Sequence, residues 1–234
     1  MTSRYAIYYA PDERSDLWRF AASWLGRDPV SGEAVPRPAI DGLDADFVAE
    51  ATASPHHYGF HATLKSPFSL ADGVYAAHLV HALSEFAARR APFAAPRLEL
   101  ARLGHFLALG LSAPDARMDA LAAACVREFD RFRAPPTEDE LARRRKAGLD
   151  ERQQALLAKW GYPYVMDAFR FHMSLTGRLP DADLDRVEAA LTPHVAPFCA
   201  APLPVDSVCL YWQKDRQTPF MLIRRFPFGR SQAG

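Results

Sequence analysis

Cysteine is scarce in this sequence: the 234 residues contain only Cys125, Cys199 and Cys209. The three are widely spaced and no pair has C-x-x-C spacing, so neither a disulfide framework nor a zinc knuckle is expected. No apolar run reaches the length of a secretion signal core or a membrane span. These features predict a soluble cytoplasmic protein.

An excess of either charge is also missing. Lys+Arg and Asp+Glu both total 28, so the formal net charge is zero. A protein that binds a long polyanion is normally basic, because each phosphate contact needs a cation. The balance favours a small substrate, or a short RNA end as the only nucleic-acid partner. Residues 143–146 form a basic run, but acidic residues four positions earlier favour a salt-bridged helix face there.

An internal repeat is the most informative pattern. Residues 59–64 read Gly-Phe-His-Ala-Thr-Leu, and residues 170–175 read Arg-Phe-His-Met-Ser-Leu. Each predicted strand is followed by a loop, a helix and two more strand-like runs. The histidines, His61 and His172, lie 111 residues apart, close to half the chain. We interpret the repeat as a diverged duplication.

Each repeated strand combines a histidine and a hydroxyl on one face. Side chains alternate with period two along a strand, so His61, Thr63 and Lys65 are predicted to point one way. His172 and Ser174 share a face in the same manner, and the residues between them are apolar. Two such strands side by side would line a cleft with two imidazoles and two hydroxyls.

This inventory suits phosphoester cleavage. One neutral imidazole takes a proton from water or a ribose hydroxyl, and the other, protonated, donates a proton to the leaving alkoxide. Histidine serves both tasks because its usual pKa is about 6.5. Hydroxyl groups, helped by Lys65, can stabilise charge on the non-bridging phosphate oxygens. No metal is required. Either histidine can be the base.

The strings His61-Ala62-Thr63-Leu64 and His172-Met173-Ser174-Leu175 both fit the H-hydrophobic-[T/S]-hydrophobic motif. Over nearly its whole length the chain therefore resembles the two-histidine (LigT-like) phosphoesterase superfamily. The wider strings at 58–65, 160–164 and 4–9 resemble the branch associated with bacterial phosphonate-utilisation operons. Ser174 replaces the commoner threonine and keeps its hydroxyl.

The resemblance implies an α+β fold with two pseudo-symmetric lobes of antiparallel sheet and outer helices around a central cleft. We expect one bilobal domain over 1–234, with halves at 1–114 and 162–234 and a helical insertion at 115–161. A strand is predicted at 5–10. The proline-rich stretch at 29–38 reads as a loop, either a surface excursion or a lid.

The resemblance also implies activity on cyclic phosphodiesters, such as 2′,3′-cyclic nucleotides, RNA cyclic-phosphate ends or ADP-ribose cyclic phosphate. We predict a metal-independent cyclic phosphodiesterase for a small nucleotide or ribose cyclic phosphate, without a cofactor, with a role in phosphonate metabolism. The alternatives are an RNA-end phosphodiesterase or ligase, and a non-catalytic nucleotide- or RNA-binding module. The predicted catalytic residues are His61, His172, Thr63 and Ser174, and the predicted substrate-binding residues are Lys65 and Tyr58.

A metal site at the first motif is not expected. His57 and His61 have the i,i+4 spacing of helical metal ligands, but the segment between them reads as loop and strand. Tyr58 could stack on a base or sugar, although an aromatic residue before a strand more often belongs to the core.

Overall fold

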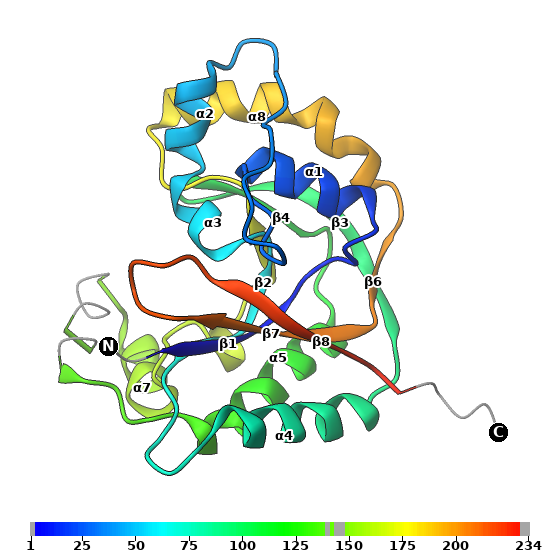
Figure 1. The fold of residues 1–234 in the computed structure, drawn as a ribbon. Helices are drawn as coiled ribbons and strands as arrows, with labels where there is room; N and C mark the ends of the chain where they lie inside the picture. The colour runs from blue at the N-terminus through cyan, green and yellow to red at the C-terminus, as the bar shows by residue number, and fades with distance from the viewer. Residues whose placement is uncertain (1–2, 139–140, 143–147, 230–234) are drawn as a thin grey trace.

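The computed structural model describes residues 3–138, 141–142 and 148–229 (Figure 1). The basic run at 143–146 lies outside these ranges. The described strands are β1 (Arg4–Tyr9), β2 (Ala62–Phe68), β3 (Phe93–Leu103), β4 (Phe106–Leu111), β5 (His172–Ser174), β6 (Pro202–Val205), β7 (Ser207–Gln213) and β8 (Met221–Pro227). They form one sheet in the order β6-β3-β4-β5-β2-β1-β7-β8, and every pairing is antiparallel.

The described α-helices cover the sheet. They are α1 (Asp16–Leu25), α2 (Ala45–Ala51), α3 (Ala53–Tyr58), α4 (Ala76–Ala88), α5 (Ala116–Phe129), α7 (Glu151–Trp160) and α8 (Asp181–Val195). In Figure 1, α4 and α5 lie below the strands and α1, α2 and α8 lie above them. The predicted α+β class with an antiparallel sheet is confirmed, as are the strand near 5–10 and helices within 115–161.

The first helix shows how local sequence sets element boundaries. Ser15 caps α1 by accepting a hydrogen bond from the backbone N–H of Trp18. Gly26 ends the helix in the left-handed conformation, with φ of 74°. Its buried face includes Trp24, whose indole N–H donates to the carbonyl of Leu175 at 2.8 Å. This bond ties α1 to the end of β5 and therefore to the second motif.

The two lobes do not coincide with the two halves of the sequence. Helix α4 follows β2 along the chain but packs on β7 and β8 from the second half. Helix α8 follows β5 but packs on β3 and β4 from the first half. Each repeat therefore packs its helix on strands from the other half of the sequence.

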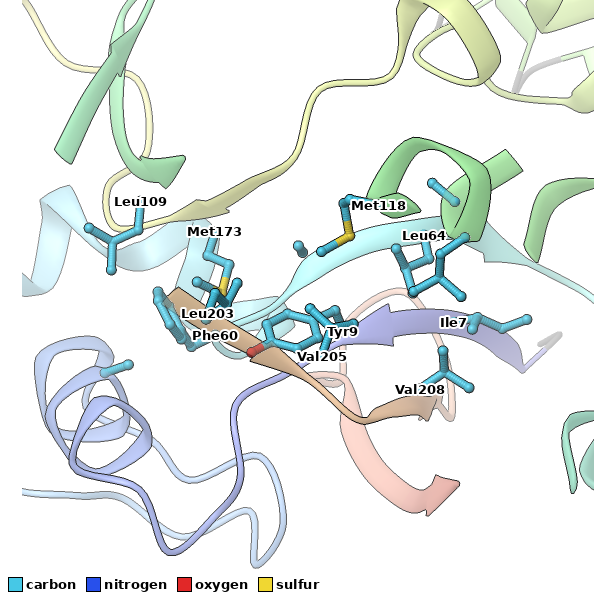
Figure 2. Packing of buried hydrophobic residues seen from close by; sticks show 14 of the residues in the cluster. Ile7, Tyr9, Phe60, Leu64, Leu109, Met118, Met173, Leu203, Val205 and Val208 are labelled. Carbon is cyan, nitrogen blue, oxygen red and sulfur yellow. The ribbon is translucent and has the colours of Figure 1, made fainter. Parts of the chain in front are cut away.

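One continuous core joins the lobes. Buried side chains from β1, β2, β4 and β5 meet those of α5 and β6 (Figure 2). In this view Met118 of α5 lies between Leu109 and Met173 on one side and Leu64 and Ile7 on the other. Because this core holds β2 and β5 rigidly together, the opposite face of the same two strands is a fixed platform for polar groups.

The proline-rich stretch at 29–38 packs against the body of the protein. The backbone N–H of Leu222 donates to the carbonyl of Pro29 at 2.8 Å, and Ser23 donates to the carbonyl of Pro36 at 2.6 Å. None of its residues lines the cavities described below. The structure therefore favours the surface excursion over the lid. No helix in the described ranges has both the length and the apolar character needed to cross a membrane.

Candidate active site

The strands that carry the two motifs are neighbours, and they pair antiparallel through Ala62 and Met173. These residues hold the same position in the two motifs, so a pseudo-twofold axis between them relates the strands. Both side chains are fully buried in the core. The residues flanking them therefore point to the opposite face, and the register brings each histidine beside the hydroxyl residue of the other motif.

His61 is held by two hydrogen bonds. Its Nδ1 lies 2.8 Å from the carbonyl oxygen of Gly59, and its Nε2 lies 3.2 Å from the hydroxyl of Thr63. A carbonyl only accepts, so Nδ1 carries the proton of the neutral ring and Nε2 presents its lone pair, to which the hydroxyl donates. The chain fixes both the orientation and the tautomer of this imidazole.

His172 repeats the arrangement. Its Nδ1 lies 2.9 Å from the carbonyl oxygen of Arg170, again two residues earlier in the chain. Its Nε2 makes no hydrogen bond with a described residue. The same hydrogen bond occurs at both histidines, so the backbone of each repeat holds its own imidazole ring. The two motifs are therefore equivalent in structure as well as in sequence.

Burial distinguishes the two rings. The His61 ring stacks on Tyr8, with the ring centroids 3.7 Å apart and the planes 22° apart. Burial lowers the pKa of His61 from 6.5 to about 4, while the bond to Gly59 raises it and the nearby His172 lowers it. Free His61 is therefore neutral at neutral pH, the form that accepts a proton.

This pKa predicts a pH dependence of stability. The folded pKa of His61 lies below the unfolded value, so the unfolded chain takes up this proton first as pH falls. The stabilising contribution is complete above pH 6.5 and is lost between about pH 6.5 and pH 4. Within this window the free energy of unfolding decreases as the pH falls. His61→Gln is expected to reduce the slope of this decrease by up to about 1.4 kcal/mol per pH unit. Urea unfolding at several pH values measures it, and identical slopes in the two proteins would contradict the assignment.

Gly59 has a conformation that side-chain-bearing residues avoid. Its φ is 76° and its ψ is 169°, and an added Cβ would lie 2.8 Å from Cβ of Pro29. We expect Gly59→Ala to destabilise the fold by about 1–3 kcal/mol and to lower activity, because the carbonyl that holds His61 moves. Gly73→Ala is the matched control, since Gly73 also has a positive φ but open space around it. Urea unfolding that ranks Gly59→Ala no worse than Gly73→Ala would show that this constraint is absent.

A cavity of about 320 Å³ collects the motif side chains. It is lined by His61, Thr63, His172 and Ser174, and by Tyr58 at the end of α3. The structure thus brings five of the six predicted site residues together.

Other cavity residues were not identified as site residues from the sequence. They come from several segments of the chain and include Arg4, Tyr8, Ser66, Phe106, Tyr162 and Arg178. Arg4, Tyr8 and Tyr162 belong to the strings that carried the family resemblance, which was the available signal for them. The cations Arg4 and Arg178 suit a negatively charged ligand.

Lys65 is the exception, and its predicted role is corrected. Tyr8 pairs with Thr63 but Ile7 pairs with Lys65, so β2 has one extra residue here and forms a β-bulge. The bulge turns Lys65 to the face of Ile7, where its ammonium lies 3.2 Å from Asp130 and its side chain is 3% exposed. It does not line the cavity, and Ser66 lies there instead.

Helix α3 also departs from the sequence prediction. Residues 53–58 are helical rather than loop, but Gly59 ends the helix before His61, so His57 and His61 do not share a helical face. His57 instead lies 2.8 Å from Nε2 of the Gln213 side chain. Buried Arg27 donates to the carbonyls of His56 and His57 and holds the end of α3 in place. Among the described residues, no three His, Cys, Asp or Glu side chains are grouped to hold a metal ion.

Comparison with known proteins identifies the family. Residues 63–221 match the family described as "Protein of unknown function (DUF1045)", and the chain belongs to this family. Two curated relatives, both named ribose 1,5-bisphosphate phosphokinase PhnN, come from Janthinobacterium sp. (strain Marseille) and Laribacter hongkongensis (strain HLHK9). The first is 40% identical over 97% of this chain and the second 34% over 94%, with 51% of each relative covered. The chain thus spans about half the length of these relatives.

Solved structures with a similar arrangement include phosphoesterases. A crystal structure of a phosphoesterase has a TM-score of 0.43 and 13% identity, with 98% of this chain and 100% of that chain covered. E. coli LigT complexed with 3′-AMP has a TM-score of 0.44 and 14% identity, with 97% and 99% covered.

Proposed function

We propose that this chain is a metal-independent cyclic phosphodiesterase for a small nucleotide or ribose cyclic phosphate, acting in phosphonate metabolism in the cytoplasm. The observation that carries the proposal is the pair of imidazoles in one small cavity, each with Nδ1 held by its own backbone. Each Nε2 is thereby the reactive nitrogen. A cavity built only to bind phosphate needs cations rather than two oriented acid–base groups.

The reaction follows from this arrangement. One Nε2 accepts a proton from water as the water oxygen forms a bond to phosphorus. The bond from phosphorus to one ring oxygen breaks, and the protonated Nε2 of the other histidine gives its proton to that oxygen. The product is a phosphate monoester with one free hydroxyl. Ser174 and the cavity cations Arg4 and Arg178 stabilise the charge on the non-bridging oxygens. The Thr63 hydroxyl joins them when it turns from Nε2 of His61 to the phosphate.

The names of the relatives direct the choice of sugar. Ribose 1,5-bisphosphate is the product expected when a 1,2-cyclic phosphate on ribose 5-phosphate is opened at the bond to O2. A phosphodiesterase with this product would supply the compound that those relatives are named for. No glycine in this chain is followed by lysine, so the G-x-x-x-x-G-K-[ST] loop of many kinases does not occur in it. We do not propose kinase activity for these residues.

Phosphorus NMR tests the proposal directly. The protein, with excess chelator, is incubated with ribose 5-phosphate 1,2-cyclic phosphate, with a 2′,3′-cyclic nucleotide and with an RNA carrying a cyclic-phosphate end. We expect the cyclic resonance of a small substrate to be replaced by that of a monoester. Loss of turnover on chelation would contradict the metal-free mechanism. Turnover of the RNA end alone would favour the RNA-processing alternative, and tight binding without turnover the binding module.

A further inference from the structure

A second, larger cavity adjoins the candidate active site. Its volume is about 600 Å³, and it shares Arg4, Ser66 and Pro67 with the first cavity. Its other polar lining includes Arg133 and Arg216. The two cavities therefore adjoin along these shared residues.

Arg133 is built into the wall of the second cavity. Its guanidinium forms a two-pronged pair with Asp130, with distances of 2.8 and 3.2 Å, and its side chain is 15% exposed. It also packs on Gly161, where an added Cβ would lie 3.0 Å from Nη1. The bonds of Arg133 use Nε and Nη2, and Nη1 makes no hydrogen bond with a described residue. A fixed guanidinium with an unused donor is suited to an anion.

A buried charge behind Arg133 also makes the second cavity suitable for an anion. Lys65 and Arg133 both pair with Asp130, so the three side chains together carry one net positive charge. Burial lowers the pKa of Lys65 to about 8, partly opposed by Asp130, and the ammonium is therefore mainly charged at neutral pH. The bulge that removes Lys65 from the first cavity thus places its charge behind the second.

Arg4 is fixed where the two cavities meet. Its Nε and Nη2 both donate to the side-chain oxygen of Gln213. Gln213 is fully buried and is held in turn by His57 at 2.8 Å and by the carbonyl of Thr218 at 2.7 Å. This network sets the position of the Arg4 guanidinium before any ligand arrives.

Two carboxylates also line the second cavity, Asp72 and Asp215. Asp215 is engaged in its own turn, where one oxygen accepts from the backbone N–H groups of Gln217 and Thr218 at 2.9 and 3.0 Å. Asp72 is exposed. The described lining thus has three arginines against two carboxylates, a formal charge of +1.

We propose that the second cavity is a subsite for a second phosphate group of the same substrate. The substrate class is then a sugar cyclic phosphate that also carries a phosphate monoester, with the monoester held by Arg133, Arg4 and Arg216. This proposal rests on the proposed function of the first cavity. Arginine binds phosphate through parallel N–H donors, and charge-assisted bonds of this kind exceed neutral ones in strength.

The test compares two substrates that differ only at the distal group: ribose 1,2-cyclic phosphate with and without its 5-phosphate. We expect the wild type to prefer the 5-phosphate form by at least about tenfold in kcat/KM, the effect of one charge-assisted hydrogen bond. Arg133→Gln should cut this preference about tenfold. Arg216→Gln, on an exposed turn, tests the same cavity away from the Lys65–Asp130 pair and should also reduce this preference. Arg186→Gln, on the outer face of α8, is the matched control and should retain it.

Binding of ribose 5-phosphate, followed by calorimetry, tests the subsite apart from catalysis. We expect the wild type to bind it and Arg133→Gln to bind it at least about tenfold more weakly. An equal kcat/KM for the two substrates in the wild type, or ribose 5-phosphate binding that neither variant weakens, would overturn the subsite. If neither cyclic phosphate is turned over but ribose 5-phosphate still binds in a way that depends on Arg133, the proposed function is overturned and the subsite is supported.

Discussion

Replacing His61 or His172 with alanine is expected to lower kcat on a cyclic phosphodiester by at least about 10²-fold, the contribution of one general acid or base. Each variant removes one of the two proton transfers, because each imidazole offers a single reactive nitrogen to the cavity. The double variant should be little worse than the poorer single variant, since groups that act in one step are not additive. Steady-state kinetics with the most active small substrate measures all three.

His105→Ala is the matched control for these variants. His105 lies in the turn between β3 and β4, outside both cavities, and its imidazole is 55% exposed. We expect its kinetics to equal those of the wild type. A loss in His105→Ala as large as that in His61→Ala would mean that the effect is not specific to the cavity, and full activity in either cavity variant would exclude that histidine from catalysis.

Removing Asp130 is expected to cause a large loss of stability. Lys65 is 3% exposed and its ammonium pairs with the Asp130 carboxylate, which lies 3.2 Å away. Asp130→Ala leaves a buried charge without its counter-ion, and breaking such pairs from one side costs about 3–5 kcal/mol. Urea unfolding at pH 7 measures the change.

A double-variant cycle separates this effect from simple loss of packing. In a Lys65→Met background the buried charge is gone, so Asp130→Ala is expected to cost at least about 1 kcal/mol less than in the wild type. Asp16→Ala removes an exposed pair with Arg19 and should cost below about 1 kcal/mol. Equal costs of Asp130→Ala in both backgrounds would show that Lys65 does not depend on Asp130.

The sequence predicted correctly which side chains face the cavity wherever side chains alternate regularly along a strand. The prediction failed where a β-bulge interrupts this alternation. His61 with Thr63, and His172 with Ser174, share a face because each pair is two residues apart on a strand. Lys65 follows at the same spacing, but the bulge after Thr63 reverses its direction. A bulge depends on how β1 and β2 pair, and the sequence of β2 alone does not contain that information.

Residues from distant segments required the three-dimensional structure. Arg4 reaches the site because β1 lies between β2 and β7, and Tyr162 because α7 ends beside the cavity. The packing of α4 on β7 and β8, and of α8 on β3 and β4, also depends on contacts between distant segments. The order of elements along the chain was predictable, but the choice of sheet partner for each helix depends on long-range packing.

In the proposed mechanism, one histidine gives a proton to the leaving oxygen and the other takes one from water. Catechol cyclic phosphate tests it, because its leaving phenolate, with a pKa near 10, needs far less protonation than a sugar alkoxide. We predict that one of the two variants, His61→Ala or His172→Ala, recovers at least about tenfold relative to the wild type on this substrate, whereas the other does not. Recovery identifies the general acid. Equal impairment of both variants on catechol cyclic phosphate and on ribose cyclic phosphate would contradict the division of roles.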